Sequence, residues 1–407
     1  MSKKRQTGSP LLPMLAFLLL LSPLWSSCSQ DDRADGGSAG GLRPLTFTVS
    51  SEGGAWQEDT RGALLTTLSG AFGILGCEYD EWGDGQKPDM MYNEIVQGSG
   101  SAWKTSVAYV PQASKTMSFF AYYPYSANID DETVKDKNGN DIVNTLWMQS
   151  GAESTGYPNF TYSVPEKVSD QKDLMVAMAH GTFGTDASGK IVDKATGEEA
   201  TIALQFHHLL AAVKFKVNDN FDKGKITRVE LTNMAYQHTF NYGLTEDDGV
   251  TPKFDWSAKT PKSSRRTHYA ELDFPMTGTK GNTPQELTDE TEVFMLIPQT
   301  INAGTLINVT FNNGKQDFVI SYKLGQKTQN NKITLQKGKV TTFYLNITSI
   351  HKMTVKATVM DWDNGGIFGG DMSDQEQVDM EAVIKPWDTE DSEGNSTTTN
   401  IVTGAQD

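Results

Sequence analysis

Residues 205–217 read "QFHHLLAAVKFKV", two adjacent histidines followed by an apolar run. In a β-strand, neighbouring side chains point to opposite faces, so alternate residues share a face. The face that begins with Phe206 is apolar early and basic late, whereas the face that holds His207 is polar early and apolar late. Because the buried face changes near the histidines, we expect this strand to bulge or to cross from one sheet to another.

The same alternation decides what the two histidines can do. His207 and His208 would point to opposite faces of a strand, and in a helix they would diverge by about 100°. Neither geometry lets both rings bind one metal ion. A structural role is therefore favoured over a metal site or a catalytic pair.

The rest of the chain consists of short apolar runs bounded by turn residues, with no sustained helical period. Examples are "LTFTV" (45–49), "FGILGCEY" (72–79), "MSFFAYYPY" (117–125) and "MTVKATVMDW" (353–362). Asn138-Gly139 and Asn313-Gly314 lie between such runs, which predicts hairpins with type I′ turns. The fold class predicted is all-β, most simply two tandem antiparallel β-sandwich domains.

A polar, glycine-rich stretch at 180–201 suggests the domain boundary. We expect an N-terminal sandwich at 43–185, a C-terminal sandwich at 198–365 and an acidic tail at 366–407. Within the tail, "MEAVIKPWD" (380–388) matches "VKATVMDWD" (355–363) at four of nine positions. The tail could thus hold a second copy of the last strand, although chance explains a match of this size as well.

The N-terminus has the layout of an export signal. Residues 1–27 combine a basic start with a long apolar stretch and small residues before Cys28, as in a bacterial lipoprotein signal. Trp25 departs from the usual pattern, and an ordinary signal peptide is the alternative. Residues 28–42 form a polar tether whose Asp31 and Asp32 resemble a surface-export signal, so we expect a lipidated cysteine and an outer-membrane or cell-surface location.

Charge and motifs exclude several functions. The formal net charge of −16 argues against nucleic acid as a partner, because binding phosphates needs clustered Lys and Arg. No common hydrolase, nucleotide-binding or zinc-protease motif occurs, and no cofactor or metal site is expected. "DKNGND" (136–141) lacks the glycine of a calcium loop and predicts a hairpin turn. Cys77 is expected to be buried and inert.

The order of these segments resembles the fimbrillin family, the type V pilins and related pilus proteins of Bacteroidales. The resemblance covers residues 28–366. Its most characteristic parts are "FHHLLAAVKFKV" and the terminal "DW" strand, and the following segments carry the rest: "LTFTV", "DTRG", "FGILG", "SFFAYYPY" and "DLMVA". The family implies transthyretin-like sandwiches, export as a lipoprotein and no enzymatic activity.

The resemblance also implies an assembly mechanism. In polymerising members a trypsin-like protease cuts after an arginine beyond the first strand, and a strand of the next subunit fills the groove. Carried onto this chain, 43–61 is the removable strand and loop, and Arg61–Gly62 is the cleavage site, with a plain surface arginine as the alternative. The strand's inward-facing residues would be Leu45, Phe47 and Val49.

The donor strand would come from the C-terminal strand or from its tail copy. The candidate residues are Val355, Ala357, Val359 and Trp362 in the strand, and Ala382, Ile384 and Trp387 in the tail. The partners implied are other pilin subunits, the protease, the outer membrane through the lipid anchor, and a host protein or glycan. The alternative function is a non-polymerising surface lipoprotein that binds a glycan or host ligand, with Trp82, Trp103, Trp147, Tyr122, Tyr123 and Tyr125 as a stacking platform. Aromatic residues in strands are more often part of the core.

Overall fold

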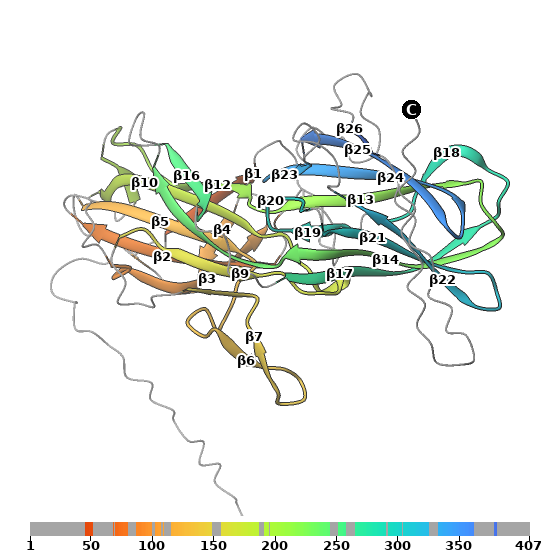
Figure 1. Cartoon of the computed structure of the whole chain (residues 1–407). Coiled ribbons are helices and arrows are strands. Elements are labelled where there is room, and N and C mark those ends of the chain that lie inside the picture. Colours follow the sequence, from red (N-terminus) through yellow and green to blue (C-terminus); the bar gives the residue numbers. More distant parts are fainter. Residues whose placement is uncertain are drawn as a thin grey trace, which may run out of the picture. The chain divides into compact units, whose positions relative to one another are not determined.

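A computed structural model of the chain describes residues 45–51, 68, 70–79, 87–99, 102–106, 109, 115–148, 156–186, 191–194, 196–244, 251–257, 265–289, 292–302, 304–324, 333–361 and 378–380 (Figure 1). These residues form β-strands joined by turns, with a single 3-10 turn, η1 (Val168–Asp170). The predicted all-β fold is therefore confirmed for the part of the chain described. Within the same residues, no helix has the length and apolar character needed to cross a membrane.

The largest sheet closes on itself. Its strands, in spatial order, are β11 (Ile191–Asp193), β10 (Met175–Thr185), β12 (Ile202–His208), β1 (Thr46–Ser51), β4 (Ala102–Thr105), β3 (Met91–Ser99), β2 (Ala71–Tyr79) and β5 (Lys115–Tyr123). β5 pairs with β2 on one side and with β10 on the other, so seven strands form a ring and β11 extends from β10. A closed sheet has no free edges, and its inward-facing side chains fill the interior.

The interior of this ring is a core of its own. Alternate residues of β5, namely Met117, Phe119 and Ala121, are buried there together with Phe47 of β1 and Phe206 of β12. The intervening residues of β5 point outward and are buried as well, against a second sheet. That sheet contains β16 (Pro252–Trp256), β15 (Gln237–Leu244), β9 (Asn159–Ser163) and β8 (Leu146–Met148). β5 is buried on both faces, which explains its continuous apolar sequence.

Two further sheets face each other across a second hydrophobic core, which is larger than the core inside the ring. The first contains β18 (Gly281–Glu286), β13 (Ala211–Asp219), β24 (Lys339–Ser349), β25 (Lys352–Asp361) and β26 (Val378–Met380), with β19 (Phe294–Leu296) also pairing with β13. The second contains β17 (Arg265–Met276), β14 (Gly224–Ala235), β21 (Leu306–Asn312) and β22 (Asp317–Lys323). Alternating buried residues of β13, β24, β14 and β21 fill the space between them.

Two small sheets complete the fold. β20 (Gln299–Thr300) pairs with β23 (Thr334–Leu335), and β6 (Thr133–Lys135) pairs with β7 (Asp141–Val143). Both predicted hairpins are confirmed, but their predicted type I′ turns are wrong. Gly139 and Gly314 have positive φ, at 83° and 86°, whereas the asparagines before them do not. Side chains hold the turns instead, because Asp136 Oδ1 and Asn313 Oδ1 each accept two backbone N–H bonds.

The histidine-containing segment crosses between sheets, as its alternation predicts. β12 belongs to the closed sheet and ends at His208. After Leu209 and Leu210, which belong to neither strand, β13 begins in the sheet that contains β24. His207 and His208 lie at the end of β12. The His207 ring packs against Phe254, with centroids 5.0 Å apart, and the His208 ring is buried on the other face. The structural role of the two histidines is confirmed.

Strands are shared across the expected domain boundary. β12 lies after the polar stretch at 180–201, yet it pairs with β1 and β10 of the closed sheet. β15 likewise pairs with β9, which precedes that stretch. The division into tandem domains at 43–185 and 198–365 therefore stays a prediction, and the sheets do not follow its boundary.

Candidate assembly site at the first strand

β1 occupies a slot between two strands of the closed sheet. On one side it runs parallel to β12, with Phe47 opposite Ile202 and Val49 opposite Leu204. On the other side it runs antiparallel to β4, with Phe47 opposite Trp103. Backbone pairing on both sides ties this strand into the sheet. Taking β1 out would leave β12 and β4 with unpaired edges, which are templates for another strand.

The side chains of β1 are as deeply inserted as its backbone. Leu45 is 1% exposed and Phe47 is fully buried, while Val49 is partly buried against the same core. The Phe47 ring meets Phe119 edge-on, with centroids 5.8 Å apart, and Phe72 at 6.4 Å. Full burial of side chains of this size is worth about 1.5–3 kcal/mol each. The three residues expected to face inward thus do lie in or against the core.

The slot itself is apolar on the inside of the ring. Trp103 of β4 and Phe206 of β12 are both buried there, and each approaches the Phe72 ring, with centroids at 5.5 Å and 5.2 Å. An empty slot would therefore expose aromatic surface together with two unpaired strand edges. A donor strand with alternate apolar residues satisfies both at once.

The predicted lipidation residue, Cys28, and the predicted cleavage site, Arg61 and Gly62, lie outside the described residues. The same holds for four of the donor-strand candidates: Trp362, Ala382, Ile384 and Trp387. Lipidation, cleavage after Arg61 and the role of the tail copy stay predictions. β1 ends at Ser51, so the expected cleavage site follows the inserted strand in the chain.

The predicted donor strand within the domain is an integral strand of its own sheet. β25 pairs with β24 over its whole length, and Val355 and Ala357 are buried, with Val359 half-buried. On its other side, β25 pairs with β26, whose Val378 lies opposite Ala357 and whose Met380 lies opposite Val355. The segment that ends at the first residue of the expected tail copy, Met380, therefore adds to the sheet beside the strand that the tail resembles (Figure 1).

The expected aromatic platform is not on the surface. Trp103, Trp147, Tyr122 and Tyr123 are at most 5% exposed, so they belong to the core and cannot stack on a ligand. The core interpretation of these residues is confirmed, and the platform built on them is wrong. Tyr125 is half-buried, and Trp82 lies outside the described residues. Cys77 is buried, as expected, and burial raises the pKa of its thiol to about 12.

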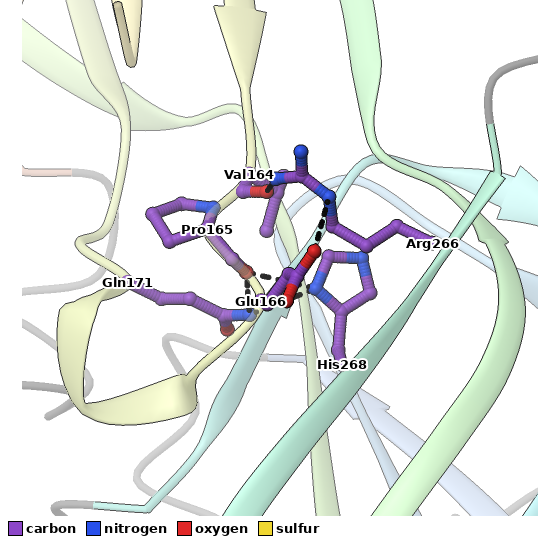
Figure 2. A network of polar contacts seen from close by, with 6 residues as sticks. All are labelled: Val164, Pro165, Glu166, Gln171, Arg266 and His268. Atoms are coloured by element: carbon purple, nitrogen blue, oxygen red, sulfur yellow. Dashed lines mark hydrogen bonds and ion pairs between the residues drawn. The ribbon is translucent and has the colours of Figure 1, made fainter. Parts of the chain in front are cut away.

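A polar cluster that the sequence did not reveal joins the segment before η1 to β17 (Figure 2). Gln171 donates its Nε2 to the Pro165 carbonyl oxygen at 2.9 Å, and its Oε1 accepts the Met295 backbone N–H at 2.7 Å. His268 Nδ1 lies 2.9 Å from the same Pro165 oxygen, so the ring donates from Nδ1. Burial lowers the pKa of His268 to about 4, and the ring is neutral at pH 7.

Arginine side chains lie beside this buried cluster, on the surface. Arg266 donates to the Val164 carbonyl oxygen and forms an ion pair with Glu166, with Nε and Oε1 3.3 Å apart (Figure 2). Together with Arg228 of β14 and Arg265 of β17, Arg266 and Glu166 line a shallow hollow. Arg228 is far in sequence from the two arginines of β17, and the pairing of β14 with β17 brings them together.

Residues 73–362 match the family described as fimbrillin-like, which is more than half of the chain. The chain therefore belongs to the fimbrillin-like family. It is 26% identical, over 261 residues, to the fimbrium subunit Fim1C of Phocaeicola vulgatus, an alignment that covers 59% of this chain and 60% of that protein. It is 24% identical over 181 residues, 44% of this chain and 31% of that protein, to a Bacteroides ovatus protein named "Putative fimbrium tip subunit Fim1C".

The chain thus spans less than two thirds of the length of these curated relatives. Among solved structures, it is similar to a fimbrial protein from Bacteroides vulgatus, with 19% identity and a TM-score of 0.47. That similarity covers 78% of this chain and 99% of the other.

Proposed function

We propose that this protein is a non-enzymatic structural subunit of a surface fimbria, with a role in adhesion. It is exported as a lipoprotein anchored at Cys28 in the outer membrane and assembles head-to-tail with other fimbrial subunits. A trypsin-like protease cuts after Arg61, β1 leaves, and a strand of the next subunit takes its place. Membership of the fimbrillin-like family supports the fimbrial role.

One observation carries the assembly step. β1 is held between β12 and β4 by backbone bonds and by the buried side chains of Leu45 and Phe47, and it is the first strand described in the chain. A single cut after it would separate it from the rest of the fold. The vacated slot then offers two strand edges and an aromatic floor, so an incoming strand regains the contacts that β1 gave up. The donor strand and the slot that receives it are different parts of each subunit, so the contact is head-to-tail. The assembly therefore grows as an open filament.

The donor is the C-terminal strand or the tail. β25 is integral to its own sheet, which favours the tail segment 380–388 as the donor, since its departure leaves that sheet's paired strands β24 and β25 in place. Deletion of 367–407 then abolishes polymerisation and leaves the monomer folded.

Limited trypsin treatment tests the mechanism. The expected result is a product that begins at Gly62 by N-terminal sequencing and forms ladders on gels. Arg61→Ala should block both, and Arg61→Lys, which trypsin still accepts, should preserve both. Filaments from the Arg61→Ala protein after trypsin, or cleavage at Arg61 without any ladder, would contradict the proposal.

A further inference from the structure

The outer face of the β14–β17 pair holds a shallow hollow lined by arginine and tyrosine. Its volume is about 470 Å³, within the range of small-molecule sites. The lining residues are Glu166, Arg228, Tyr236, Arg265, Arg266, Thr267 and Tyr269. The charged side chains among them are three arginines and one glutamate, and Glu230 beside the hollow pairs with Arg228. The arginines therefore exceed these two carboxylates by one positive charge, on a chain whose formal net charge is −16.

Two of the arginines are held flat on aromatic rings. The Arg228 guanidinium lies over the Tyr269 ring, 3.7 Å from its centroid, and that of Arg266 lies over the Tyr236 ring at 3.9 Å. Stacking of this kind fixes the plane of the guanidinium and leaves its edge N–H groups available. A pre-oriented guanidinium loses less side-chain entropy when it binds an anion than a freely moving one does.

Donors remain after the protein's own contacts are counted. With the described residues, Arg228 forms an ion pair with Glu230, and Arg265 donates to the carbonyl oxygen of Asn233. The Arg265 guanidinium also faces the side-chain amide of Asn302. Arg266 donates to the Val164 carbonyl oxygen and forms an ion pair with Glu166. Each guanidinium has five N–H donors, which is more than these contacts use.

A β-bulge shapes the site. β14 and β17 change register between Leu231 and Met234, and within the bulge Asn233 has a φ of 55°. A left-handed conformation at a residue other than glycine costs energy and is found preferentially at functional sites. The bulge bends the end of β14, and Tyr236 follows directly after it, at the place where its ring meets Arg266. The strain and the arginine cluster are independent observations at one place.

We propose that this hollow binds a carboxylated sugar residue, such as a uronate unit of an acidic polysaccharide. The planar carboxylate matches the fork of N–H groups on a guanidinium, and two stacked forks give it a defined orientation. Tyr236, Tyr269 and Thr267 also line the hollow. Each carries a hydroxyl, a neutral hydrogen-bonding group of the kind that sugar hydroxyls pair with. The proposal does not depend on strand exchange, because the site belongs to the β14–β17 face and not to the β1 slot.

Calorimetric titration of the purified full chain tests this site, with methyl glucuronide as the probe and methyl glucoside and inorganic phosphate as comparison ligands. We expect saturable binding of the glucuronide, at least tenfold tighter than that of either comparison ligand. The Arg228→Gln/Arg266→Gln double variant, which removes both stacked guanidiniums, should bind the glucuronide at least tenfold more weakly. Lys225→Gln, on the same strand, should bind as the parent does, since Lys225 lies outside the hollow and pairs with Asp273.

Each other outcome counts against the site. Absence of saturable binding overturns it, and so does equal binding of methyl glucoside, which would make the charge irrelevant. If phosphate binds as tightly as the glucuronide, the hollow is a general anion site that does not recognise sugars. If Lys225→Gln weakens glucuronide binding as much as the double variant does, the net charge of the protein causes the effect, and not the hollow. If the double variant is not folded by circular dichroism, Arg265→Gln alone, at an exposed side chain, must still weaken binding.

Discussion

His208 Nδ1 lies 2.6 Å from Asp173 Oδ2, and both side chains are buried, at 2% and 0% exposure. The pair joins the end of β12 to the residues that lead into β10, next to the point where the chain leaves the closed sheet for the sheet of β13. The adjacent backbone bond from Leu209 N to Leu174 O, at 2.9 Å, reinforces the same junction. One of the two adjacent histidines, His208, thus holds the chain at the point where it crosses between sheets.

Replacing the acceptor of this pair should destabilise the fold. Asp173→Ala leaves a buried imidazole without its carboxylate, and we expect the free energy of unfolding to fall by about 3 kcal/mol. Asp173→Asn keeps an oxygen that can accept the same hydrogen bond, so it should cost less than half as much. Urea denaturation measures both, and an equal cost for the two variants would contradict the role assigned to the hydrogen bond.

Phe47→Ala tests how much the inserted strand contributes. Removal of a fully buried phenylalanine side chain typically costs about 3–5 kcal/mol, because the core does not collapse into the space. Val49→Ala should cost less, since Val49 is only partly buried. In denaturation experiments on the uncleaved chain, a Phe47→Ala cost below that of Val49→Ala would show that the slot does not depend on its aromatic contacts.

Acid should weaken the fold through His268. Burial lowers the pKa of this ring from 6.5 to about 4, so the folded protein keeps it neutral while the unfolded chain takes up a proton. The stabilisation is therefore complete above pH 6.5 and is lost as the pH falls toward 4, by up to about 3 kcal/mol. His180 and His238, whose pKa values burial also lowers, act in the same direction.

His268→Gln separates this contribution from the others. The variant retains His180 and His238, so the difference between the two proteins isolates one ring. Denaturant titrations at pH 7 and pH 4 should show a smaller loss of stability in the variant. Parallel losses in both proteins would contradict the assignment.

Much of the fold follows from local patterns. The alternation around His207 and His208 predicts the crossing between sheets, and the continuous apolar sequence around Phe119 predicts a buried strand. The register of β1 could not be predicted, because Phe47 pairs with Ile202 only through the closure of a ring that no local pattern encodes. The prediction of a type I′ turn at Gly139 was wrong for a different reason. The Asp136 side chain accepts two backbone N–H bonds within the turn and so stabilises another turn conformation.

Some of the site residues could likewise be predicted from the sequence, and others could not. The burial of Leu45 and Phe47 follows from strand alternation near the start of the chain. The hollow around Arg228 and Arg266 has no sequence signature, because it depends on the pairing of two strands and on a bulge at Asn233. The sequence shows each arginine as an ordinary surface residue of a strand, because the ring on which it stacks lies elsewhere in the sequence.

The placement of β1 also sets an order of events during folding. A chain leaves the ribosome with its N-terminus first, and the antiparallel neighbour of Phe47, Trp103, follows well before its parallel neighbour, Ile202. Until β12 has emerged, β1 has a partner on one side only and the ring stays open, because pairing between distant segments waits for the later one. Within the closed sheet, the strand that is made first is thus among the last to be paired on both sides, and its aromatic surface needs protection during that interval.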